Sequence, residues 1–93
     1  MIIGVVRFYL EISSSFCLKD KRRILNSLKT KLKNKFNVSV AEIGEKDVWN
    51  LSELAVAVVS DDSAFCDAQL GKITSFVEEF NDVHILEIKQ EIF

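Results

Sequence analysis

The sequence contains no proline and only three glycines, at positions 4, 44 and 71. Because these residue types most often interrupt helices and strands, their scarcity predicts regular elements joined by short connections. There is also no internal repeat, low-complexity tract or linker. We therefore expect one domain over residues 1–93, which is long enough to bury a core without disulfides or metals.

Residues that bind metals or carry redox chemistry are scarce as well. The two cysteines, Cys17 and Cys66, form no CxxC pair, and His84 is the only histidine. A structural zinc site needs about four Cys or His ligands. We therefore expect no zinc site within one chain and, more generally, no metal and no cofactor.

Signals for membranes or export are the third absence. No apolar run approaches the roughly 20 residues of a membrane-spanning helix. Arg7 interrupts the apolar start of the chain, and no small-residue cleavage site follows it. Together with the two unpaired cysteines, these features predict a soluble, cytoplasmic protein with no membrane partner.

Charge is plentiful but unevenly placed. Residues 1–41 carry nine basic and two acidic side chains, residues 42–93 carry three basic and twelve acidic ones, and the net charge is −2. Eight of the twelve Lys and Arg residues lie in the segment KDKRRILNSLKTKLKNK, residues 19–35. The net charge conceals this asymmetry, which makes the basic segment a candidate for electrostatic binding.

Hydrophobic periodicity predicts six elements. Alternation indicates strands over 2–12, 37–44, 51–60 and 83–93, and spacings of three to four indicate helices from about 20 to 36 and from 60 to 80. The apolar stripe of the first helix consists of Ile24, Leu25, Leu28, Leu32 and Phe36. The order β-α-β-β-α-β predicts the ferredoxin-like α+β fold, a four-stranded antiparallel sheet with both helices on one face.

The sheet face opposite the helices is predicted to be too apolar for water alone. Its apolar strand residues are Ile3, Val5, Ala41, Ile43, Leu51, Ala55, Ala57 and Ile85. Because a contiguous exposed apolar patch marks an association surface, we expect a homodimer through this face. The predicted interface residues are Ile3, Val5, Ala41, Ile43, Ala55 and Ala57. The alternative is a monomer with scattered apolar surface residues.

The basic segment is expected to place its charges on the solvent side of the first helix. Arg22, Asn26, Lys29 and Lys33 follow one another at helical spacing in a row about 16 Å long, and the row contains no acid. Such a row matches the phosphates of a nucleic acid. The predicted binding residues are Lys19, at the entry, Arg22, Arg23, Lys29 and Lys33.

The alternative for this helix is a solvated face whose charges pair with acids from the second half of the chain. Lys21 and Lys35 lie nearer the apolar stripe. We expect both to extend outward to water along their aliphatic stems.

Three segments resemble the signature of the YlxP-like family, short bacterial proteins of unknown function. They are CLKDKRR (17–23), NKFNVSVAE (34–42) and WNLSELAVAVVS (49–60). The resemblance covers nearly the whole chain and implies a ferredoxin-like fold. It also implies an association with translation, because genes of this family tend to lie beside those for translation initiation and ribosome maturation. Two positions depart from the family: Cys17 replaces a usual Ser, and Glu45 replaces a common His.

No segment predicts catalysis. The loop SSSFC after the first strand lacks the glycines and the arginine with which acylphosphatase, an enzyme of related fold, holds phosphate. His84 is interpreted as a packed edge residue of the last strand and not as a general base, and Cys66 as a small apolar residue of the second helix. Cys17 has no base placed beside it, so we expect no enzyme activity.

The segment EIGEKDVWN, residues 42–50, is interpreted as a hairpin turn. Glu42, Glu45 and Asp47 lack the spacing of a calcium-binding loop, so they are expected to be solvated. Trp49 is expected to pack at the sheet edge, with contact to another protein as the alternative.

The sheet is not expected to bind RNA. An RNA-recognition motif stacks bases on aromatic residues of its first and third strands. Here Tyr9 is the only off-core aromatic residue of the first strand, and the third strand offers Ala55 and Ala57 instead. If RNA binds, the basic helix is the expected surface.

The sequence thus predicts a non-catalytic factor that associates with RNA or the ribosome through its basic helix. Two alternatives remain. One is a regulatory module of the ACT type, which shares this topology and binds small ligands at dimer interfaces. The other is a protein–protein adaptor that uses the acidic second half. A bound small ligand raises the melting temperature, whereas phosphate contacts weaken as salt rises, so these two measurements distinguish the hypotheses.

Overall fold

The computed structural model describes the whole chain, Met1–Phe93. Its strands are β1 (Ile2–Ile12), β2 (Ser39–Gly44), β3 (Leu51–Ser60) and β4 (Val83–Ile92), and its helices are α1 (Leu18–Lys35) and α2 (Ser63–Glu78). All six predicted elements are present. Their ends differ by a few residues because caps set them: Cys17 has an extended backbone, so α1 begins at Leu18. Asp62 begins α2 by accepting from the N–H groups of Ala64 and Phe65.

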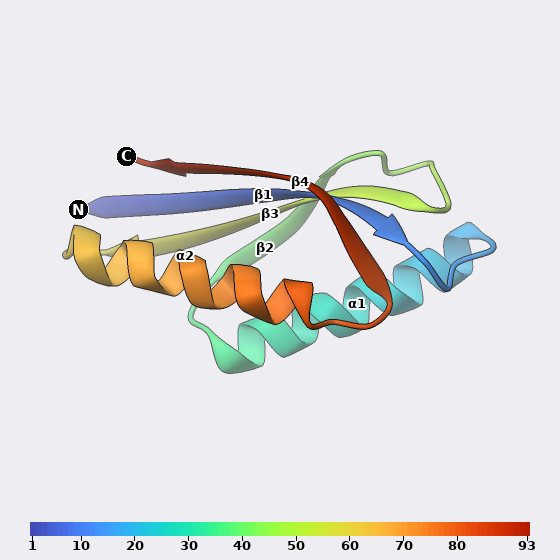
Figure 1. The fold of residues 1–93 in the computed structure, drawn as a ribbon, viewed down its shortest axis with the longest axis horizontal. Helices are drawn as coiled ribbons and strands as arrows, with labels where there is room; N and C mark the ends of the chain where they lie inside the picture. The colour runs from blue at the N-terminus through green and yellow to red at the C-terminus, as the bar shows by residue number, and fades with distance from the viewer.

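The four strands form one antiparallel sheet in the order β2-β3-β1-β4. Figure 1 shows both helices on the same side of this sheet. The helix α2 contacts β1, β3 and β4, while α1 contacts β2 and α2. The predicted ferredoxin-like α+β fold is confirmed. Neither helix combines the length and the apolar character that crossing a bilayer requires.

The core lies between the sheet and the two helices. Every second residue of β1 from Val6 to Ile12 is buried, and so is the α1 stripe from Ile24 to Leu32, with Phe36 packed at its margin. Burying each such side chain contributes about 1.5–3 kcal/mol. This packing fixes the rotation of α1 and thereby decides which of its side chains face solvent.

The prediction for Ile85 is wrong. Ile85 was placed on the open sheet face, but it packs against the core. The reason is an irregularity in the pairing of β1 with β4, which shifts the register between Tyr9 and Leu10 and sets Ile85 opposite the buried Leu10. Because strand side chains alternate between faces, a one-residue shift reverses the face of every residue on one side of it.

Candidate nucleic-acid interface

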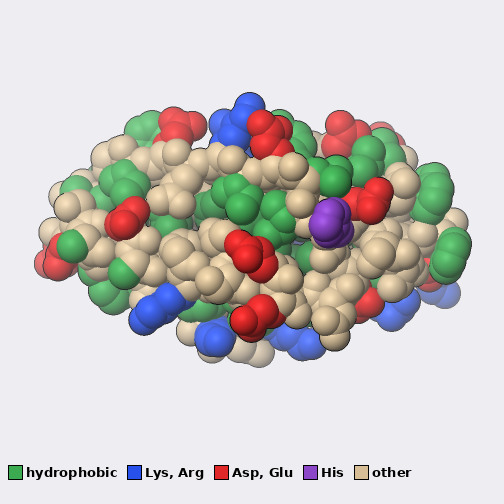
Figure 2. Space-filling view, viewed as in Figure 1, with side chains coloured by type: hydrophobic (Ala, Val, Ile, Leu, Met, Phe, Trp, Pro, Cys, Tyr) green, Lys and Arg blue, Asp and Glu red, His purple; other side chains and the backbone are tan.

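The packing of α1 turns most of its basic side chains to solvent. Of the five predicted binding residues, Lys19, Arg22, Arg23 and Lys33 are exposed and Lys29 is half-buried. In Figure 2, Lys and Arg side chains gather along the lower edge of the molecule, where Figure 1 places α1. The structure therefore presents these five residues on one helix whose orientation the core determines.

None of these five side chains has an acidic partner within the protein. The structure contains three salt-bridge contacts, which are Arg7–Glu53, Arg7–Glu91 and Lys21–Glu42. The alternative interpretation requires the solvent side of α1 to pair with acids from the second half of the chain. The structure contains no such pair. Unpaired exposed cations retain their attraction for an external polyanion.

Lys31 and Lys35 extend toward α2 and not along this solvent side. The Nζ atom of Lys31 lies 5.3 Å from the ring centre of Phe80. The Nζ atom of Lys35 lies 5.2 Å from the ring centre of Phe76 and 5.8 Å from that of Phe36. These distances are those of cation–π contacts, which join the C-terminal half of α1 to α2.

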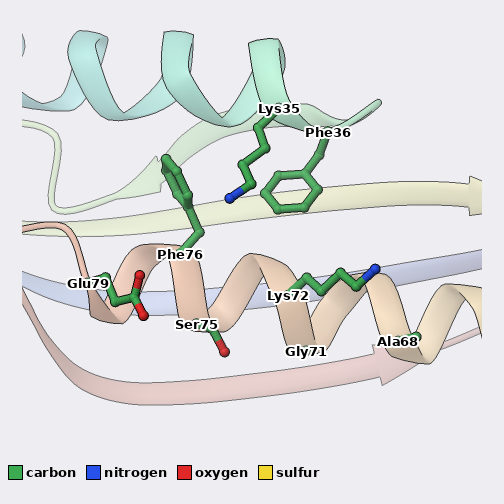
Figure 3. A pocket seen from close by; sticks show the side chains of 8 residues that line it. All are labelled: Lys35, Phe36, Ala68, Gly71, Lys72, Ser75, Phe76 and Glu79. Atoms are coloured by element: carbon green, nitrogen blue, oxygen red, sulfur yellow. The ribbon is translucent and has the colours of Figure 1, made fainter.

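A groove of about 550 Å³ separates the end of α1 from α2. Figure 3 shows Lys35 descending between the rings of Phe36 and Phe76, with Lys72, Ser75 and Glu79 along α2. The volume falls in the range of small-molecule sites. The Lys35 ammonium group beside two aromatic rings makes one end of the groove cationic and apolar, while Glu79 adds an acid to its lining. No local pattern in the sequence indicates this groove, because its two walls are distant in the chain.

The prediction that Lys21 extends outward to water is wrong. Its side chain is 2% exposed, and its Nζ atom lies 3.0 Å from Oε2 of Glu42. The same ammonium group donates to the carbonyl oxygens of Glu45 at 2.6 Å and Val48 at 2.7 Å. Ser52 donates its hydroxyl to Glu42 Oε2 at 2.7 Å. Lys21 therefore attaches the β2–β3 loop to α1 from inside.

A second buried side chain attaches the same loop to the segment between β1 and α1. The Ser15 hydroxyl is 2.6 Å from the carbonyl oxygen of Trp49 and 3.0 Å from that of Cys17. Glu45 adopts a left-handed backbone with φ of 59°, which is unfavourable for a residue other than glycine. The bonds from Lys21 and Ser15 fix this loop and offset that cost.

Trp49 is not packed at the sheet edge as predicted. It lies in the β2–β3 loop with 45% of its surface exposed, and Phe16, in the neighbouring loop, is 83% exposed. Phe16 directly precedes Cys17, the N-cap residue of α1. The Ser15 hydrogen bond holds the backbone of Trp49 next to the same segment. The sequence offered aromatic residues in polar loops as a signal, but not the hydrogen bonds that bring the loops together.

The open sheet face is divided into an apolar part and a charged part. Ile3, Val5, Ala55 and Ala57 are half-buried, while Ala41 and Ile43 are exposed on β2. Beside them, a charged ladder centres on Arg7, which lies 3.8 Å from Glu53 and 3.6 Å from Glu91. The structure therefore brings Ile3, Val5, Ala41, Ala55 and Ala57 together on one face, next to the charged ladder. Ile43 lies at an irregularity in the pairing of β2 with β3, beside Glu53.

Tyr9 lies within the charged part of this face. The pKa of the Tyr9 hydroxyl is raised above its ordinary value. The larger cause is loss of hydration, and the next is the nearby negative charge of Glu53. The Nζ atom of Lys89 lies 6.0 Å from the centre of the Tyr9 ring. Tyr9 thus lies among both acidic and basic side chains, Glu53 and Glu87 on one hand and Arg7 and Lys89 on the other.

The remaining candidate residues are dispersed. His84 is on an edge strand as expected, but it is exposed and lines a groove of about 410 Å³ with Glu78 and Ile88, so the expected packing is wrong. β4 is an edge strand of the sheet, which leaves this side chain uncovered. Cys66 is buried in the core and Cys17 is exposed. No three His, Cys, Asp or Glu side chains are arranged as metal ligands would be.

The fold and the surface together define a class: a small ferredoxin-like α+β domain with an unpaired basic helix on its outer layer. Residues 3–90 match the family described as "Protein of unknown function (DUF503)", and the chain belongs to this family. It is 30% identical over 92 residues to "Uncharacterized protein YlxP" of Bacillus subtilis (strain 168). The aligned region covers 99% of this chain and 100% of that protein. The resemblance found in the sequence is confirmed.

Two solved structures share the fold. The de novo designed protein Foldit4 matches with a TM-score of 0.54 at 16% identity, over 98% of this chain and 96% of the design. LarC2, the C-terminal domain of a cyclometallase involved in the synthesis of the NPN cofactor of lactate racemase, matches in its apo form with a TM-score of 0.52 at 12% identity, over 100% of this chain and 55% of that chain. At these identities the likeness concerns the fold alone.

Proposed function

We propose that this protein is a non-catalytic, cytoplasmic factor that associates with RNA or the ribosome. Lys19, Arg22, Arg23, Lys29 and Lys33 of α1 bind phosphates in this proposal. The observation that carries it is that these residues share one packed helix and have no acidic partner within 4.0 Å. Phosphate contacts of this kind position a protein on RNA but carry no sequence information, so specificity has another source.

The proposal is tested by RNA affinity as a function of salt. Four or five phosphate contacts predict a slope of roughly −3 to −4 in a plot of log affinity against log salt. Changing Arg22 and Lys33 together to Glu removes two contacts. We expect the slope to become shallower by about 1.5 and the affinity to fall more than about tenfold. Fluorescence anisotropy of a labelled RNA hairpin with a long single-stranded loop measures both quantities.

The matched control changes Lys72 and Lys89 together to Glu. This variant has the same net charge as the α1 variant, but its two substitutions lie on α2 and β4. We expect it to keep the slope of the unmodified protein. Equal losses in both variants would show that only the net charge matters, and a flat salt response of the unmodified protein would refute phosphate binding altogether.

We propose in addition that two copies associate through the apolar part of the open sheet face. Val5 lies opposite Ala57 in this part. Ile3 and Ala55 are next to the pair along β1 and β3, Ala41 lies opposite Ala55, and Ile43 is farther along β2. Changing Val5 to Glu should convert a dimer of twice 10.6 kDa into a monomer, because a charge would be buried without a partner. Light scattering measures the mass, and Lys72→Glu on α2 is the control. A monomeric mass for the unmodified protein would rule out the dimer.

A further inference from the structure

We infer that Trp49 and Phe16 form a stacking site for unpaired RNA bases at the N-terminal end of the basic helix. The inference rests on the proposed function, since the phosphates of the same strand are bound by α1. It adds a second kind of contact, which involves the bases and carries no charge.

Two buried side chains attach the loop that carries Trp49. Ser15 donates to the carbonyl oxygen of Trp49 itself, at 2.6 Å, and Lys21 donates to that of the preceding residue, Val48, at 2.7 Å. The backbone of Ile12 also donates to the carbonyl oxygen of Asn50, at 2.9 Å. The backbone at Trp49 is thus bonded on both sides, so the ring is presented from a fixed position.

The folded core does not account for either aromatic ring. Neither Trp49 nor Phe16 belongs to the core or to the residues packed against it. Large aromatic side chains contribute to stability mainly when they are buried. A tryptophan that is 45% exposed and a phenylalanine that is 83% exposed, on adjoining loops, therefore offer ring surface to an external group.

The unpaired basic side chains at the start of α1, next to the two loops, favour RNA as that group. The basic residues of the adjoining segments are Lys19, Arg22, Arg23 and Lys46. The acidic ones are Asp20, Glu45, Asp47, Glu11, which lies opposite Leu51, and Asp82, whose Oδ1 atom accepts from the Ser14 hydroxyl at 3.1 Å. Asp20 is occupied locally, since its Oδ2 atom accepts from the Phe16 N–H at 3.1 Å. The acids are therefore at least as numerous as the basic residues around the loops themselves. The positive charge comes from the adjoining side of α1, where Lys19, Arg22 and Arg23 have no acidic partner. Aromatic rings beside a basic surface are the combination that binds single-stranded nucleic acids.

Stacking and phosphate contact have different physical signatures. A base stacks on a ring without displacing counterions, so loss of the ring should lower affinity and leave the salt slope unchanged. Loss of Arg22 and Lys33 should change the slope. The two contributions can therefore be separated in one set of titrations.

Trp49 is the only tryptophan in the chain, so its fluorescence reports on this site alone. We expect the labelled hairpin to quench this fluorescence with the same dissociation constant that anisotropy gives. Trp49→Ala should weaken binding by about 5- to 150-fold at an unchanged slope, and Trp49→Phe should retain most of the affinity. Phe16→Ala tests the second ring without changing the β2–β3 loop. Its matched control is Phe93→Ala, which removes an exposed phenylalanine at the end of the sheet.

Each outcome decides the inference. RNA binding with neither quenching nor loss in Trp49→Ala and Phe16→Ala would overturn it and leave the proposed function intact. Absence of RNA binding would overturn both. If the two variants keep their RNA affinity but lose a protein that the unmodified chain retains from a cell extract, the rings form a protein contact and the inference is wrong. A steeper or shallower slope in Trp49→Ala would contradict the assignment of an uncharged contact.

Discussion

Replacing Lys21 with methionine is expected to lower the free energy of unfolding by about 3 to 5 kcal/mol. The substitution preserves most of the aliphatic volume but removes the ammonium group. Glu42 is then left without its counterion, and the carbonyl oxygens of Glu45 and Val48 lose their donor. Urea denaturation, followed by circular dichroism, measures the loss. Lys19→Met, at an exposed position of the same helix, should change stability by less than about 0.5 kcal/mol.

A second substitution shows whether the loss arises from the isolated carboxylate. Combining Lys21→Met with Glu42→Leu removes both charges, and we expect the double variant to be less destabilised than the sum of the single variants by about 0.5 to 3 kcal/mol. Strict additivity would mean that the two side chains do not interact in the folded state. A change below 1 kcal/mol for Lys21→Met alone would contradict the buried network.

Lys21 also shows why sequence periodicity predicted the fold better than the site. The apolar stripe from Ile24 to Leu32 follows helical spacing, and that spacing alone decides which side of α1 is buried. Periodicity placed Lys21 near this buried side but gave no reason for it to remain there. The reason is a set of acceptors in residues 42–48, which only the tertiary structure brings to the helix.

The basic side of α1 was predictable for the same reason that the fold was. Arg22, Lys29 and Lys33 face away from the stripe by helical geometry, without reference to any other element. In contrast, Trp49 and Phe16 are brought near each other by the Ser15 hydrogen bond between two loops. Their polar neighbours indicated loops, but no local pattern encodes which loops adjoin.

The face assigned to Ile85 was wrong for a third reason. The alternation in β4 is regular in sequence, whereas its pairing with β1 contains a shift next to Leu10. A bulge adds a residue to one strand and thereby changes the side on which the following residues lie. Neither glycine nor proline marks this position in β4, so the sequence contained no sign of the interruption.

Gly4 provides the second large effect, an expected loss of about 1 to 3 kcal/mol when it is changed to Ala. A Cβ atom at this position would collide with Sγ of Cys66 and lie 3.0 Å from Cδ1 of Leu70. Cys66 and Leu70 are both fully buried side chains of α2, so neither neighbour has room to withdraw. At an unconstrained strand position the same change would instead be favourable by about 0.5 to 1 kcal/mol.

Two comparisons test this explanation for Gly4. Gly71→Ala, in α2, should stabilise the protein by about 0.5 to 1 kcal/mol, because nothing lies within 4 Å of the added Cβ atom. Cys66→Ala should relieve part of the collision, so that Gly4→Ala costs less in that background than in the unmodified protein. Urea denaturation of Gly4→Ala, Gly71→Ala, Cys66→Ala and the double variant at positions 4 and 66 gives the sign of each change in the free energy of unfolding. If Gly4→Ala and Gly71→Ala shift stability in the same direction, glycine at position 4 does not serve the close approach of β1 and α2.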